Sequence, residues 1–178
     1  MINLVLIIVL AIGLWCEWAQ AKSYQTQQQA LAGTFLSDHV ARKTLFLTTD
    51  QVKQIEQLGK VKVYFRIVSY YVGKNASGAT ETAFFDRQVV RTMPMTYMVV
   101  VRPAGELDRV EILSFDEPDD YLPPTRWLQL YRNRVLSDDL RIGSAIPHIT
   151  GASLTSQAVN DGVRRALAIY AVAVKGAS

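Results

Sequence analysis

Residues 149–156 read Ile149-Thr150-Gly151-Ala152-Ser153-Leu154-Thr155-Ser156, and residues 157–170 continue QAVNDGVRRALAIY. The second stretch repeats apolar side chains at the three- and four-residue spacing of an amphipathic helix, one face of which lies in a core. A hydroxyl at Thr155 or Ser156 is the expected N-cap of this helix. The expected core face consists of Val159, Val163, Leu167 and Ala171, with Ala166 and Tyr170 beside it.

The turn in front of this helix is made of small residues that lie between hydroxyl residues. Gly151 and Ala152 leave room for a bulky group to approach the backbone, and Thr150 and Ser153 flank them. A helix N-terminus exposes unpaired N–H groups and a partial positive charge, and both favour a phosphate. The turn therefore predicts a phosphate site at the start of the helix.

Outside the C-terminal helix, most of the predicted secondary structure consists of β-strands. Runs rich in β-branched and aromatic residues occupy 61–72, 84–91, 95–101 and 110–115, and a shorter run occupies 43–47. Polar turns at 74–78 and 103–107 separate neighbouring runs and predict hairpins. We expect an α+β fold, in which a mostly antiparallel sheet, built from segments between about Val61 and Phe115, packs against the C-terminal helix.

Two shorter helices are also predicted. Thr48 and Gln51 have capping-box spacing before an apolar helical pattern, and Gly59 is placed to end that helix in a left-handed conformation. After the proline-rich loop 116–124, Thr125 is expected to cap a second short helix. The polar, Gln-rich residues 22–33 are expected to form a loose lead-in, within a polar N-terminal segment 22–42 that precedes a domain at 43–178.

The N-terminus resembles a secretory signal peptide. A short apolar run at 4–12 precedes Ala19-Gln20-Ala21, a small-x-small pattern that predicts cleavage after Ala21. The alternative is an uncleaved membrane anchor, although the run is shorter than the ~20 apolar residues of a spanning helix. Cys16 is the only cysteine, so a chain cut after Ala21 has no thiol. We expect a periplasmic or other extracytoplasmic protein, anchored to the membrane if the signal is uncleaved.

Charge and motifs exclude several classes of protein. The net charge is +3 and the basic residues are scattered, which does not predict nucleic-acid binding. His39 and His148 lack the carboxylate or thiolate spacing of a metal site. Residues 151–155 have the first glycine of a G-x-S-x-G nucleophile elbow but not the second, which disfavours a serine hydrolase. The chain has no dinucleotide-binding glycine motif and no P-loop.

The segment Thr150-Gly151-Ala152-Ser153-Leu154-Thr155-Ser156 resembles the flavinylation motif of the FMN-binding domain family, which occurs in the NqrC and RnfG subunits of ion-pumping oxidoreductases and in small exported flavoproteins. The family pattern has an acidic residue, two further residues, Ser or Thr, Gly, Ala, and a final hydroxyl residue that is esterified to FMN. Here the acidic position is Pro147 and the final hydroxyl is Ser153. A hairpin followed by Glu117-Pro118, then Tyr121 and Arg126-Trp127-Leu128, also resembles the family, so the likeness spans about 43–171.

The resemblance implies an exported flavoprotein that carries electrons on FMN, attached through a phosphoester to Ser153. It implies that Thr150, Gly151, Ala152, Leu154 and Thr155 surround the phosphate, and that Glu117 and Tyr121 line the isoalloxazine pocket. It also implies an FAD-dependent flavin transferase for maturation and electron-transfer partners in or on the membrane.

Other interpretations stay open at this point. Ser77-Gly78-Ala79-Thr80 spells the core of the motif more literally, which makes Thr80 an alternative attachment site on a polar hairpin loop. The protein could bind FMN non-covalently, be a cofactor-free binding module, or be an exported flavin-dependent reductase with its own substrate. Structural interpretations also apply to Tyr121 and Trp127 as core anchors, to Asp86 and Arg91 as an ion pair, and to Arg164 as a solvated side chain.

Overall fold

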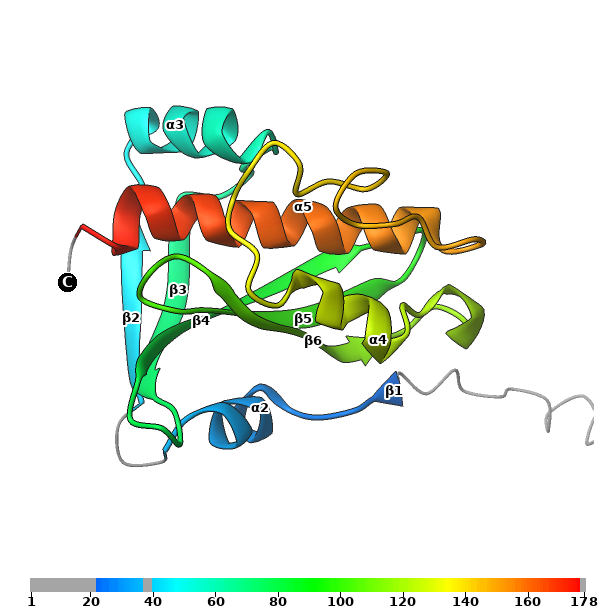
Figure 1. Ribbon diagram of the computed structural model, residues 1–178, viewed down its shortest axis with the longest axis horizontal. Helices are drawn as coiled ribbons and strands as arrows, with labels where there is room; N and C mark the ends of the chain where they lie inside the picture. The colour runs from blue at the N-terminus through cyan, green and yellow to red at the C-terminus, as the bar shows by residue number, and fades with distance from the viewer. Residues whose placement is uncertain (1–21, 37–39, 177–178) are drawn as a thin grey trace, which may run out of the picture.

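A computed structural model describes residues 22–36 and 40–176 of the chain. The predicted signal peptide and His39 lie outside these residues. The fold is a six-stranded antiparallel sheet, and its strands lie in the order β1-β6-β5-β4-β3-β2 (Figure 1). The strands are β1 (Lys22–Ser23), β2 (Ala41–Phe46), β3 (Ile67–Lys74), β4 (Thr80–Val89), β5 (Pro94–Val101) and β6 (Leu107–Phe115).

Helices lie on both faces of the sheet. The long helix α5 crosses one face and has α3 on its outer side, whereas the short helix α2 lies on the opposite face (Figure 1). The helices are α2 (Gln27–Thr34), α3 (Thr49–Gly59), α4 (Thr125–Leu128) and α5 (Ser153–Ile169), with 3₁₀ turns η2 (Asp119–Tyr121) and η3 (Gln129–Tyr131) and a π turn η4 (Tyr170–Val174). The predicted α+β class is confirmed.

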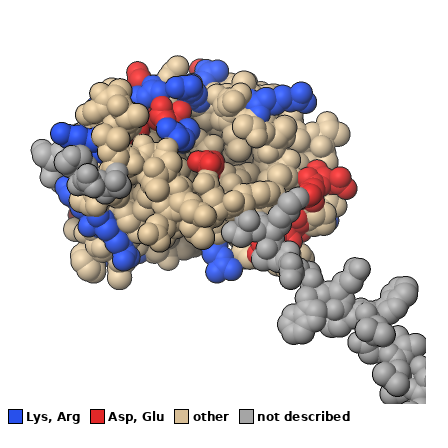
Figure 2. Space-filling view, turned by 90° about the horizontal axis from the view of Figure 1, so that it is seen from below, with Lys and Arg blue, Asp and Glu red and all other residues tan. Residues whose placement is uncertain are grey.

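Two apolar cores follow from this layering. The larger core lies between the sheet and α5, where Tyr97, Val99 and Val163 are fully buried. The smaller core lies between the sheet and α2, where Phe35 packs with Met98 and Val100. Seen from the α2 side, uncharged residues form most of the middle of the molecule, and Lys and Arg gather toward its edges (Figure 2).

The C-terminal helix keeps most of its predicted face but differs at both ends. Val159, Val163 and Leu167 are buried as predicted. Ala171 is exposed instead, because the π turn η4 changes the helical phase at that point. At the other end the helix begins at Ser153 with Ala152 as its N-cap, so neither predicted cap residue occupies that position.

Four local predictions are wrong. Thr125, expected as the cap of the second short helix, is the first residue of α4, and Pro124 occupies the N-cap position. The expected loose lead-in contains α2, whose N-cap Thr26 forms a capping box with Gln29. Residues 61–66 are irregular rather than a strand, although Val61 is buried. The left-handed residue after α3 is Lys60, with a φ of 51°, while Gly59 ends the helix where a Cβ would lie 2.9 Å from Cγ2 of Val61 and 3.3 Å from Cβ of Ala168. The capping box predicted for α3, between Thr48 and Gln51, is present.

Two further predictions, on the environment of Arg164 and on the partner of Asp86, are also wrong. Arg164 is 4% exposed and donates to the carbonyl oxygens of Gly59, Ser137 and Leu140 at 2.7–2.8 Å, so it is not a solvated side chain. Asp86 does not pair with Arg91. Its Oδ2 accepts from Nη1 of Arg165 at 2.6 Å and from the hydroxyl of Tyr97 at 2.9 Å.

Among residues 22–36 and 40–176, no helix has both the length and the apolar composition of a membrane span.

Candidate functional site

The turn before α5 has the backbone that its small residues predict. Gly151 has a φ of +83°, a left-handed conformation that glycine adopts without strain. The N–H of Ala152 donates to the carbonyl of Ile149 at 3.1 Å and closes the turn. A Cβ on Gly151 would meet nothing within 4 Å, so the backbone conformation, and not crowding, explains this glycine.

The four hydroxyl residues of the motif have different environments. Thr155 and Ser156 are buried, and the Ser156 hydroxyl donates to the carbonyls of Ala152 at 2.8 Å and Ser153 at 3.1 Å. Thr150 and Ser153 are exposed. Only Ser153 combines exposure with a place in the first turn of α5.

The helix N-terminus beside Ser153 has no side-chain cap among the residues that the structure describes. The N–H of Ser156 donates to the carbonyl of Ala152 at 3.0 Å and forms the first intrahelical bond. The N–H groups of Ser153, Leu154 and Thr155 precede that bond and have no intrahelical acceptor. They therefore can donate to a phosphate group bound at this helix end.

The other predicted phosphate neighbours divide into two groups. Thr150, Gly151 and Leu154 are accessible, and Leu154 is 58% exposed in spite of its apolar side chain. Ala152 and Thr155 have buried side chains, so only their backbone groups can face a ligand. The structure thus brings all of these residues to one helix end with different roles.

Thr80 has a different environment. It is exposed and is the first residue of β4, so no helix N-terminus follows it. The loop before it is ordered by Asn75, whose Oδ1 accepts from the N–H groups of Ser77 and Ala79 at 3.0 Å. This is the polar hairpin loop predicted from the sequence, and it lacks the free donors found beside Ser153.

Glu117 is engaged in holding a neighbouring turn. Its Oε1 accepts from the N–H groups of Arg91 at 3.1 Å, Thr92 at 2.7 Å and Met93 at 2.9 Å. The side chain is buried, and the bond from Thr92, followed by that from Met93, holds the pKa of the carboxyl below its usual range. The resemblance implies a pocket-lining role for Glu117, whereas its contacts make it a residue that positions Arg91.

We expect Glu117→Gln to lower the melting temperature by several degrees at pH 7, because a neutral amide is a weaker acceptor for three N–H groups. A carboxyl whose pKa is depressed by folding stabilises the protein above its unfolded pKa of ~4.3 and loses that contribution as pH falls through the folded pKa. The difference from the wild type should therefore shrink below about pH 4. Thermal denaturation at pH 7, 5 and 3.5 measures this difference in melting temperature. Asp120→Asn removes an exposed carboxylate from the same loop and is the control.

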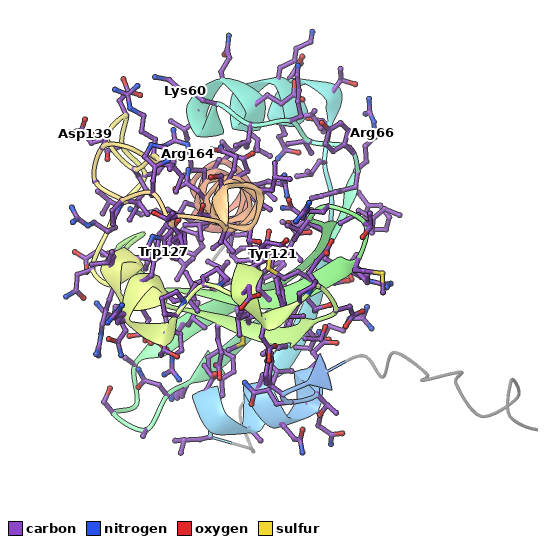
Figure 3. All side chains as sticks on the ribbon, turned by 90° about the vertical axis from the view of Figure 1, so that its right-hand side faces the viewer. Lys60, Arg66, Tyr121, Trp127, Asp139 and Arg164 are labelled. Carbon is purple, nitrogen blue, oxygen red and sulfur yellow. The ribbon has the colours of Figure 1, made fainter. Side chains whose placement is uncertain are left out.

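The turn that Glu117 holds places a cation on an aromatic ring. The guanidinium carbon of Arg91 lies 4.5 Å from the centroid of the Tyr121 ring, which is half-buried on η2. The η2 turn lies at the end of the molecule where α5 begins, and Figure 3 shows Tyr121 beside that helix end (Figures 1 and 3). No local sequence signal links Arg91 to Tyr121, because 30 residues separate them.

Trp127 connects α4 to the segment that leads into the motif. Its Nε1–H donates to the carbonyl of Pro147 at 2.8 Å, and its ring meets that of Tyr131 edge to face at 5.4 Å. Trp127 is buried, as expected of a core anchor. Pro147 stands at the family's acidic position, and its contribution here is a backbone carbonyl that holds the approach to the turn.

No metal site accompanies this helix end in the described part of the chain. No group of three His, Cys, Asp or Glu side chains there could hold a metal ion. The main cavities border the outer edge of β6, the gap between β3 and β4, and the segment after α3, and Ser153 lines none of them.

Comparison with known proteins gives a family match and similar solved structures. Residues 92–168 match the family model of the FMN-binding domain, which confirms the predicted resemblance and indicates FMN as the cofactor. No curated protein matches the chain significantly. The crystal structure of NqrC from Shewanella oneidensis is similar, with 15% sequence identity, coverage of 83% of this chain and 82% of that chain, and a TM-score of 0.49.

Proposed function

We propose, from the match of residues 92–168 to the FMN-binding domain, that this protein is an exported electron-transfer flavoprotein with FMN attached covalently to Ser153. The match indicates FMN itself, whereas the attachment, the export and the electron-transfer role are our proposals. The observation that carries the proposal is the position of Ser153. It is the one exposed hydroxyl in the first turn of α5, next to N–H groups without an intrahelical acceptor.

Attachment at this position requires a phosphoryl transfer that the chain undergoes as a substrate. A flavin transferase would supply FAD as the donor. The Ser153 oxygen would form a bond to the phosphorus of the FMN half, the pyrophosphate bond would break, AMP would leave, and the hydroxyl proton would pass to the transferase or to water. The free N–H groups of the helix end would then bind the phosphate oxygens of the ester.

Residues near the helix end could hold the rest of the cofactor. The exposed Leu154 offers an apolar contact, and the stacked pair of Arg91 and Tyr121 offers a cation on an aromatic surface. Bound FMN supplies reversible electron transfer, while the protein supplies attachment, orientation and electrostatic surroundings. The open site suits exchange of electrons with partner proteins in or on the membrane. The apolar start of the sequence, at 4–12, supports an extracytoplasmic location.

Intact-mass spectrometry of protein co-produced with a flavin transferase tests the attachment. The wild type should gain the mass of FMN less one water, and Ser153→Ala should lose this increase completely. Thr150→Ala, the other exposed hydroxyl of the motif, and Thr80→Ala, the alternative site, should keep it. An increase that persists in Ser153→Ala, or that disappears only in Thr80→Ala, would contradict the assignment.

Non-covalent binding is the second candidate, because Pro147 stands at the position where the family has an acidic residue. In that case the wild type would show flavin absorbance without any increase in mass, and denaturation would release the flavin. Absence of both signals would leave a cofactor-free binding module.

A further inference from the structure

The sheet divides between β3 and β4. These strands pair from Lys74↔Thr80 to Tyr70↔Phe84, and the ladder stops there. β3 continues beside β2 through residues 67–69, and β4 continues beside β5 through residues 85–89. Within the described residues, the facing edges of these two segments have no strand partner. We call this gap the fork.

Polar contacts fix the β4 side of the fork. On one side, Asp86 and Gln88 of β4 bind the hydroxyl of Tyr97, which is fully buried on β5. Arg165 of α5 lies at the base of the fork, where its Nη1 donates to Asp86 at 2.6 Å and its Nε donates to the carbonyl of Lys62 at 3.1 Å. These bonds tie β4 to β5 and α5, so residues 85–89 keep their place beside β5 at the edge of the fork.

A cavity of about 380 Å³ occupies the fork. Its walls come from both faces of the sheet, because Phe84 belongs to the core beneath α5 and Phe85 packs against the core beneath α2. Ala166 and Ile169 of α5 form further apolar lining. The cavity is large enough for one large apolar side chain and is apolar over most of its wall.

The surface around the fork is apolar and basic. Ile67, which lines the cavity, is 61% exposed, and Phe46, its partner in the ladder of β2 and β3, is 74% exposed. Arg87 lines the cavity, and Arg66 precedes Ile67 in the chain. Nη1 of Arg66 donates to Oγ1 of Thr49 at 3.1 Å, and neither arginine forms an ion pair with any residue that the structure describes. In Figure 3 Arg66 lies at the edge of the molecule, away from Trp127 and Asp139. Exposed apolar groups in such a cluster, rimmed by cations, indicate an interaction surface for an anionic partner.

We propose that the fork binds an extended peptide segment of a partner protein, which adds as a strand to the free edge of β4. One apolar side chain of the segment enters the cavity, and acidic side chains on either side pair with Arg87 and Arg66. Strand addition supplies backbone partners to an open sheet edge, and pockets for alternate side chains give specificity. A lipid surface could match the charge and the apolar groups, but it would leave the backbone edges of the fork without partners, which is costly in hydrocarbon.

The proposal does not depend on the flavin, so the test uses the Ser153→Ala protein. Random-sequence peptides displayed on phage are selected on this protein, and synthetic versions of the enriched sequences are measured by fluorescence anisotropy. We expect enriched peptides to share a large apolar residue flanked by Asp or Glu. Arg87→Glu and Ile67→Ser should each weaken their binding by about tenfold or more, equivalent to 1.4 kcal/mol. Arg126→Glu and Val135→Ser, which change exposed residues outside the fork, should not.

Backbone chemistry separates strand addition from a side-chain contact alone. N-methylation of the peptide at one set of alternate residues should abolish binding, whereas methylation at the other set should leave it unchanged, because alternate N–H groups of a strand point to opposite sides. Amide exchange at residues 85–89 should slow in the complex. Equal effects of the two methylation patterns, or equal binding to the Arg87→Glu protein, would overturn the proposal. Binding to phosphatidylglycerol vesicles that Arg87→Glu abolishes, without any selected peptide, would overturn it in favour of a membrane surface.

Discussion

Replacing Gly162 with alanine is expected to destabilise the protein by about 3 kcal/mol, near the upper end of the usual cost of overpacking. A Cβ on Gly162 would lie 1.6 Å from the hydroxyl oxygen of Tyr97 and 2.4 Å from its Cζ. The helix α5 therefore crosses β5 at a distance that only glycine permits. Because α5 begins with the candidate attachment turn, any shift of the helix would also displace Ser153.

The tyrosine cannot move aside to accept the new methyl group. Tyr97 is fully buried, its hydroxyl donates to Asp86 at 2.9 Å, and it accepts from Nε2 of Gln88 at 2.7 Å. Burial and the adjacent carboxylate raise the pKa of the Tyr97 hydroxyl well above its usual range, so it remains a donor at all physiological pH values. Swinging the ring away would leave Asp86 and Gln88 without this partner.

Thermal and urea denaturation followed by circular dichroism measure the effect of Gly162→Ala. At roughly 3 °C per kcal/mol for a domain of this size, the expected fall in melting temperature is about 10 °C. Gly33→Ala is the matched control, because a Cβ at this position of α2 would meet nothing within 4 Å. That control should be neutral or stabilising by up to about 1 kcal/mol. In a Tyr97→Leu background, which removes the clashing atoms, Gly162→Ala should cost much less than in the wild type.

Arg164→Met is expected to destabilise the protein by about 3 kcal/mol, since it removes buried hydrogen bonds and leaves their acceptors without partners. Nε of Arg164 donates to Gly59 at the C-terminal end of α3, where a cation is also favoured by the helix dipole. Nη1 donates to the carbonyls of Ser137 and Leu140. Figure 3 shows Arg164 between α5, α3 and the loop that carries Asp139. One side chain thus joins three segments.

Arg164→Met should also destabilise one segment locally, in addition to lowering the stability of the whole domain. Desolvation lowers the pKa of Arg164 below its usual value, yet the guanidinium stays protonated at neutral pH and keeps all its donors. Without these donors the segment 132–148, which leads into the attachment turn, should become more susceptible to limited proteolysis. Arg126→Met, at an exposed position on α4, should change stability by no more than about 0.5 kcal/mol. Unchanged proteolysis in Arg164→Met would contradict the anchoring role.

Local sequence patterns predicted the elements whose signals lie within a few residues. The runs rich in β-branched and aromatic residues at 95–101 and 110–115, with the turn between them, predicted the hairpin of β5 and β6, and the spacing of Thr48 and Gln51 predicted the start of α3. The missed helix α2 carries the same kind of signal, since Thr26 and Gln29 form a capping box. Only Ala30 and Thr34 of α2 are buried, so the sequence has no clear apolar face at helical spacing that would predict this helix.

By itself, the sequence determined the α+β class, the motif around Ser153 and the match of residues 92–168 to the FMN-binding domain, because these depend on side chains that are close together along the chain. Tertiary structure decided which polar groups are buried and which backbone groups they bind. Arg164 reaches a carbonyl 105 residues away, Glu117 binds a turn 24–26 residues away, and Ser153 differs from Thr155 and Ser156 only by the side of α5 on which it lies. Such partners come together only when the sheet and α5 pack, since burial of a polar group depends on acceptors that distant segments supply.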